Sequence, residues 1–271
     1  MTIVAFDRVQ HLVRVPLTVG DVECRFRVDT GIGITVVSSA LADRLGVATT
    51  GETFVGRRMS GQALEVPLVR VPRIALGDYL VEEHLAGIAD LGDANDPAGF
   101  AGILGPAFFE EHVVTTDPRA LTLTVQQRDR YQPDGPVVPL DVRRESASVD
   151  PFAQLVLPSG REITVEVDTG SDSLILDLRF VADCEVDLAG PDVTTRTGTD
   201  ETGYEWTRHW VTIAGSVHLA AAPETAQQAP RVQFQEIIHD GLVGAGYLER
   251  YRTTFDVTGE RLVLGGSETE L

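Results

Sequence analysis

The chain has 271 residues, which is enough for about two domains of ordinary size. Its net charge is −19 at pH 7 and it has no lysine, which argues against a nucleic-acid partner because phosphates would be repelled. No run approaches the roughly 18 apolar residues of a membrane span, and residues 1–8 lack the start of a signal peptide. We therefore expect a cytoplasmic protein that contacts neither membrane nor nucleic acid.

The first predicted elements lead to an aspartate. Residues 12–19 and 22–28 alternate apolar and polar side chains around a turn, which predicts a hairpin that ends at Asp29. A second apolar run at 35–37 follows, and Ser39 is expected to cap a short helix after it.

The next element is a predicted hairpin at residues 55–64. Its tip carries Met59, Ser60 and Gly61. A glycine at the tip allows motion and close approach to a peptide, so these three residues are candidates for a flap over a binding cleft. A plain surface hairpin is the alternative interpretation.

The second half of the chain repeats this order. A strand at residues 162–167 ends at Asp168 with the same alternation, an apolar run follows at 174–176, and Asp177 is expected to cap a helix. A hairpin predicted at residues 197–206 gives two further flap candidates, Gly203 and Tyr204.

The repeat has a fixed offset. Asp29-Thr30-Gly31 recurs as Asp168-Thr169-Gly170, and Gly102-Ile103-Leu104-Gly105 recurs as Gly241-Leu242-Val243-Gly244, each 139 residues later. The shared offset indicates an internal duplication. With a polar, Pro- and Gly-containing linker near residue 130, it predicts an all-β chain of two similar halves, 1–130 and 131–271, related by a pseudo-two-fold axis.

Two such half-sites in a β-rich chain resemble the pepsin-like and retropepsin-like aspartic proteases over nearly the whole chain. The resemblance implies two β-barrel lobes with an active-site cleft between them. In such a protease the threonines bridge the lobes and the glycines permit the tight turn. The implied catalytic pair is Asp29 and Asp168, and the supporting residues are Thr30, Gly31, Thr169, Gly170 and Ser171.

The chemistry of two opposed carboxylates agrees with that assignment. Close together, they cannot both ionise cheaply near neutral pH, so they share one proton, as is known for aspartic proteases. The ionised member takes a proton from water while the other donates to the scissile carbonyl oxygen. Because Ser171 or Ser173 is placed to hydrogen-bond Asp168, we expect Asp168 to be the more readily ionised member.

The function predicted from the sequence is therefore that of an aspartic endopeptidase. It would act as a monomer on peptides or proteins, without cofactor or metal. An inactive peptide-binding or scaffolding module on the same fold is the alternative. A metal site made by Asp29 and Asp168 is disfavoured because Asp172 is the only further acid or histidine beside the motifs. His239 is interpreted as a loop residue.

Overall fold

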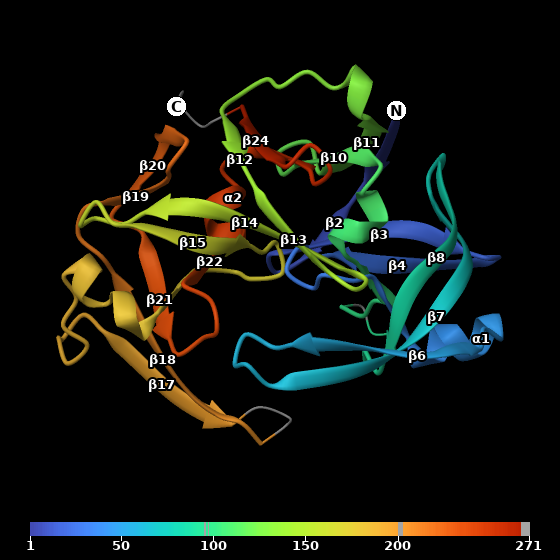
Figure 1. The fold of residues 1–271 in the computed structure, drawn as a ribbon, viewed down its shortest axis with the longest axis horizontal. Helices are drawn as coiled ribbons and strands as arrows, with labels where there is room; N and C mark the ends of the chain where they lie inside the picture. The colour runs from blue at the N-terminus through green and yellow to red at the C-terminus, as the bar shows by residue number, and fades with distance from the viewer. Residues whose placement is uncertain (95, 97, 200–202, 267–271) are drawn as a thin grey trace.

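The computed structural model describes residues 1–94, 96, 98–199 and 203–266 (Figure 1). In this part of the chain, strands make up 55% of the structure and helices 9%, and the strands form three sheets, so the expected β-rich class is confirmed. No helix among these residues is long and apolar enough to cross a bilayer.

The first sheet is built from residues of the first half and lies on the right of Figure 1. Its strand order is β2-β3-β4-β9-β5-β8-β7-β6. The strands are β2 (Asp7–Val9), β3 (Leu12–Val19), β4 (Val22–Val28), β5 (Val36–Ser38), β6 (Thr49–Arg57), β7 (Ala63–Leu76), β8 (Tyr79–Ala89) and β9 (Gly102–Leu104). Strand β9 lies between β4 and β5, parallel to β4 and antiparallel to β5.

The second sheet comes from the second half and lies on the left of Figure 1. Its order is β17-β18-β21-β16-β22-β15-β14-β19-β20, and β13 also pairs with β14. The strands are β13 (Asp141–Glu145), β14 (Ser148–Val156), β15 (Glu162–Val167), β16 (Leu174–Asp177), β17 (Thr194–Thr199), β18 (Glu205–Thr212), β19 (Ser216–Leu219), β20 (Ala222–Gln228), β21 (Arg231–Gln235) and β22 (Gly241–Val243). Strand β22 lies between β15 and β16, as β9 does between β4 and β5.

The third sheet combines strands from both halves and lies at the top of Figure 1. Its order is β1-β11-β10-β23-β24-β12. The strands are β1 (Thr2–Ala5), β10 (His112–Asp117), β11 (Thr122–Gln127), β12 (Val137–Pro139), β23 (Arg252–Asp256) and β24 (Arg261–Gly265). The central pair, β10 and β23, joins the two halves with Thr115 opposite Thr254.

The repeated glycines explain how β9 and β22 fit between their neighbours. A Cβ on Gly102 would lie 2.2 Å from the Phe26 ring, and one on Gly241 would lie 2.6 Å from the backbone oxygen of Ile175. Both distances are shorter than side chains tolerate. The glycines therefore let each short strand enter its sheet, next to the strand that ends at an aspartate.

The helical segments are short. They are α1 (Ser39–Leu45), α2 (Ala245–Leu248) and the 3₁₀ turns η1 (Pro106–Phe109), η2 (Arg128–Arg130), η3 (Leu178–Phe180) and η4 (Ala182–Cys184). The cap predicted at Ser39 is wrong by one residue, because Leu41 N–H donates to Ser38 Oγ (3.1 Å). Asp177 does cap, by accepting from Arg179 N–H (3.0 Å), but two 3₁₀ turns follow it instead of an α-helix.

The apolar core is continuous across the three sheets. Phe26, Phe234 and Leu262, one from each sheet, belong to the same buried cluster. Burial raises the pKa of the free thiols of Cys24 and Cys184 to about 12, which agrees with the structural role expected of buried cysteines.

Candidate active site

The two repeated aspartates meet where β4 and β15 end. Asp29 N–H donates to Leu104 O (3.1 Å) and Asp168 N–H to Val243 O (3.0 Å), so each aspartate is anchored on the inserted strand of its own sheet. The two carboxyl groups lie close enough that Asp29 raises the pKa of Asp168. The structure therefore brings the predicted catalytic pair together.

Each carboxyl is held by the glycine of its own motif and approached by the glycine of the other. Gly31 N–H donates to Asp29 Oδ1 (3.0 Å) and Gly170 N–H to Asp168 Oδ1 (2.8 Å). A Cβ on Gly31 would lie 2.4 Å from Asp168 Cγ, and a Cβ on Gly170 would lie 2.3 Å from Asp29 Oδ2. Only glycine leaves room for the opposite carboxyl at these positions.

The two threonines bond reciprocally beneath the pair. Thr30 N–H donates to Thr169 Oγ1 and Thr169 N–H donates to Thr30 Oγ1, both at 3.0 Å. The Thr30 hydroxyl also donates to Val167 O (2.5 Å). These bonds tie the two motif loops together, which holds the carboxyls at a fixed separation.

The charges around the two aspartates differ. The Arg27 guanidinium donates to Asp29 Oδ2 (2.8 Å), and Asp29 is only 6% exposed. The pKa of Asp168 is raised to about 7, mainly by burial and then by repulsion from Asp29. The guanidinium therefore lies on the Asp29 side of the pair, and the raised pKa favours the protonated form of Asp168.

The expectation that Asp168 is the more readily ionised member is therefore wrong. The Ser171 hydroxyl donates to Ser173 O (3.3 Å) and the Ser173 hydroxyl to Asp172 Oδ1 (2.7 Å). Both hydroxyls hydrogen-bond to neighbouring residues of their own loop, as serine hydroxyls often do in turns. Ser171 supports Asp168 through its backbone instead, by donating its N–H to Asp168 O (3.3 Å).

A cleft of about 900 Å³ opens above the pair, within the range of ligand-binding pockets. Gly31, Asp168 and Gly170 line it. Met59 of the β6–β7 hairpin lines it. In Figure 1 this hairpin extends from the sheet of the first half toward the second half. Ile238 N–H of the second half donates to Met59 O (3.0 Å), so the hairpin tip contacts both halves.

The other flap candidates lie beside this cleft. Ser60 and Tyr204 line a neighbouring pocket, and a Cβ on Gly61 would lie 2.9 Å from Ile238. Gly203 has a positive φ of 84° in the turn before β18. The tip of the hairpin predicted at residues 197–206 consists of Asp200, Glu201 and Thr202, which lie outside the described residues. The flap role of all five candidates stays a prediction.

Three cleft residues were not identified as site residues from the sequence. Glu166 and Asp150 line the cleft beside Asp168, and His239 lies with its Nε2 atom 3.6 Å from Glu166 Oε2. His239 is in a loop as interpreted, but this loop faces the cleft. Glu166 shares a strand face with Asp168 because it lies two residues earlier on β15, and this period-two signal was available in the sequence.

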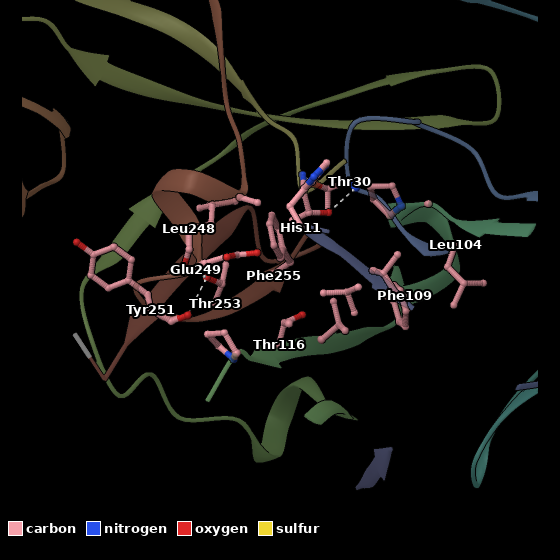
Figure 2. Close-up of a pocket in the computed structure, with 18 of the residues that line it drawn as sticks. His11, Thr30, Leu104, Phe109, Thr116, Leu248, Glu249, Tyr251, Thr253 and Phe255 are labelled. Atoms are coloured by element: carbon pink, nitrogen blue, oxygen red, sulfur yellow. Dashed lines mark hydrogen bonds between the residues drawn. The ribbon is translucent and has the colours of Figure 1, made fainter. Parts of the chain in front are cut away.

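Behind the motif loops lies a mostly apolar cavity of about 60 Å³. Figure 2 shows Phe109 and Phe255 around it, with Thr30 and His11 at the end next to the loops. His11 Nε2 lies 2.9 Å from Gly170 O, so the turn between β2 and β3 of the first half contacts the second motif loop. This cavity lies on the side of the loops that supports the carboxyls, while Asp168 lines the larger cleft.

Comparison with known proteins agrees with this geometry. A search of curated proteins finds no match. The family described as "Aspartyl protease" matches residues 15–108, which include the first motif, β4, β9 and the β6–β7 hairpin. The match ends before the second motif at Asp168. Residues 15–108 of this chain are therefore an aspartyl protease domain of the retropepsin-like kind.

Proposed function

We propose that the chain is an aspartic endopeptidase in which Asp29 and Asp168 are the catalytic pair. The observation that carries the proposal is the close approach of the two carboxyl groups, each fixed by its own glycine N–H, with Asp168 lining a cleft of about 900 Å³. Such a half-protonated pair holds a base and an acid side by side.

In this mechanism the two acids have different roles. Asp29, paired with Arg27, is ionised and takes a proton from a water molecule, which attacks the scissile carbonyl carbon. Asp168 is protonated and donates to the carbonyl oxygen, giving a tetrahedral gem-diol. As the C–N bond breaks, the proton taken by Asp29 passes to the leaving amine and Asp168 recovers its proton from the gem-diol, so both acids return to their starting states.

The proposal includes two lobes, residues 1–130 and 131–271, related by a pseudo-two-fold axis. Residues 139 apart meet each other in two places: Thr30 with Thr169, and Thr115 with Thr254, whose hydroxyls lie 2.8 Å apart. Contacts between equivalent residues are expected along such an axis, and they support the proposal. Because one chain supplies both acids, the active unit would be a monomer that cleaves a peptide or protein.

The first test is to remove one carboxylate at a time. We expect Asp29→Asn and Asp168→Asn each to reduce cleavage of a peptide library by at least about 100-fold, because each removes one half of the acid–base pair. Asp172→Asn is the matched control, since Asp172 is exposed in the same loop as Asp168. Mass spectrometry of the products measures cleavage, and cleavage that survives Asp29→Asn would reject the mechanism.

An inactive peptide-binding module is the second candidate, and one observation favours it. The Arg27 guanidinium donates to Asp29 Oδ2 and so occupies one of the two oxygens that could accept a proton from water. The same library distinguishes the two functions. An inactive module would bind peptides without producing new termini, and its binding would persist in Asp29→Asn.

A further inference from the structure

Glu166 is a buried acid beside the catalytic pair for which the mechanism has no use. It is 7% exposed, lines the cleft, and lies two residues before Asp168 on the same face of β15. Alternate residues of a strand are about 7 Å apart, roughly two residues of an extended peptide. A substrate side chain within about two residues of the scissile bond would therefore reach Glu166.

The Glu166 carboxylate has no strong partner among the described residues. The His239 Nε2 atom lies 3.6 Å from Glu166 Oε2, too long for a hydrogen bond. Burial and Arg143 lower the pKa of His239, so this ring is neutral near pH 7. Burial, followed by repulsion from Asp168, Asp150 and Asp29, raises the pKa of Glu166 well above its usual value.

The surroundings of Glu166 add a second acid and an aromatic wall. Phe152 lies directly opposite Glu166 on β14, and Asp150 lies two residues before Phe152 on the same face. Arg143 lies 3.8 Å over the Phe152 ring and its Nε donates to Asp141 (3.0 Å). Its charge lowers the pKa of Glu166 and of Asp150, but by less than burial raises them. This pocket has an apolar side for an aliphatic stem and carboxyls for a charged end.

The corresponding position in the first half carries the opposite charge. Arg27 lies 139 residues before Glu166 and is paired with Asp29, while its guanidinium lies 5.2 Å over the Phe100 ring. The acidic surroundings therefore flank the catalytic pair on one side only. A ligand charge that fits beside Glu166 would be repelled at Arg27.

We propose that Glu166, with Asp150 beside it, forms a subsite for a cationic side chain, arginine or lysine, of the bound peptide. The proposal deepens the proposed function and rests on it. Entry of the cation provides the partner that this carboxylate lacks, and Glu166 releases its proton to solvent as the pair forms. The chain would then cleave within about two residues of a basic side chain.

The test compares substrates that differ in charge but hardly in shape. One peptide taken from the cleaved library is made with arginine, lysine, citrulline or norleucine at the position nearest Glu166. We expect kcat/KM for arginine to exceed that for citrulline by about 10-fold or more, since only the cation forms a charge-assisted hydrogen bond with the Glu166 carboxylate. In Glu166→Gln this ratio falls to about 1, whereas Glu162→Gln, an exposed glutamate on the same strand face, keeps it.

The results separate this proposal from the proposed function. Cleavage that needs Asp29 but shows no arginine or lysine preference, or a preference that survives Glu166→Gln, overturns the subsite alone. If wild-type protein cleaves nothing, calorimetry of the arginine and citrulline peptides with Asp29→Asn decides. Equal affinities overturn the subsite, and an arginine preference lost in the double variant with Glu166→Gln supports it. Thermal unfolding verifies that each variant is folded.

Discussion

Arg27 and Glu166 are the residues that give the two otherwise matching motifs opposite charges. Both lie two positions before an aspartate on the same strand face, so the alternation of β4 and β15 was sufficient to place them near the site. Their partners could not be predicted. A hydrogen bond from Arg27 to Asp29, or the local bonds of the Ser171 hydroxyl, depends on rotamers that sequence period does not specify.

The raised pKa of Asp168 predicts a pH profile. We expect kcat/KM for peptide cleavage to fall as pH rises through about 7, because Asp168 then loses the proton that it must donate. Initial rates on one peptide from about pH 4 to pH 9 measure this limb. A rate that stays constant or increases through pH 7 would contradict the assignment of the proton to Asp168.

The raised pKa of Asp168 also predicts that the folded state becomes less stable as pH rises. A carboxyl with a raised pKa in the folded state stabilises the fold while protonated. This contribution is present below its ordinary value of 3.8 and is lost as pH rises through about 7. Melting temperatures recorded alongside the rates separate loss of the catalytic proton from unfolding, because the folded fraction at each assay temperature is then known.

At the scale of elements, the repeat predicted the positions of strands in the sheets as well as their presence. The shared offset predicted that the glycine-flanked segments occupy equivalent places, and β9 and β22 do lie in equivalent register: Gly102 opposite Phe26, and Gly241 opposite Val165. The reach of the β6–β7 hairpin could not be predicted. Its tip is held by Ile238 of the other half, a contact between segments that no local pattern relates.

The tight fit of β9 gives a stability prediction. Gly102→Ala places a methyl group 2.2 Å from the Phe26 ring and 2.6 Å from Val36 O, so we expect a loss of about 1–3 kcal/mol. Gly56→Ala is the control, because its nearest neighbour is the edge of the Phe54 ring at 3.0 Å. Thermal unfolding should show a drop of several degrees for Gly102→Ala alone. Equal melting temperatures would mean that β9 has room to move.

At the scale of the whole molecule, the third sheet makes the halves interdependent. The sequence did not predict that β10 and β23 would pair, because no periodic pattern identifies which strand of the other half lies beside a given strand. A buried ion pair reinforces this join. Arg128 Nε of the first half lies 2.6 Å from Oδ1 of Asp256, which is 0% exposed in the second half.

This ion pair predicts a cost for losing Arg128. In Arg128→Gln, Asp256 keeps Arg261 (3.0 Å) but loses its other cation, so we expect a destabilisation of about 3 kcal/mol. Arg130→Gln is the matched control in the same 3₁₀ turn, since Arg130 is exposed. Chemical unfolding measures both. If the two variants unfold at the same denaturant concentration, Arg128 does not join the halves energetically.

The opposite charges of Arg27 and Glu166 affect the direction in which a peptide substrate binds. A cleft shared by two identical subunits has the same lining on both sides of its axis, so it accepts a chain equally well from N to C or from C to N. A single polypeptide that supplies both sides is free of this constraint. Because Glu166 lines the cleft and the equivalent residue of the first half is Arg27, the two sides differ, and a peptide and its reversed sequence would bind with different affinities.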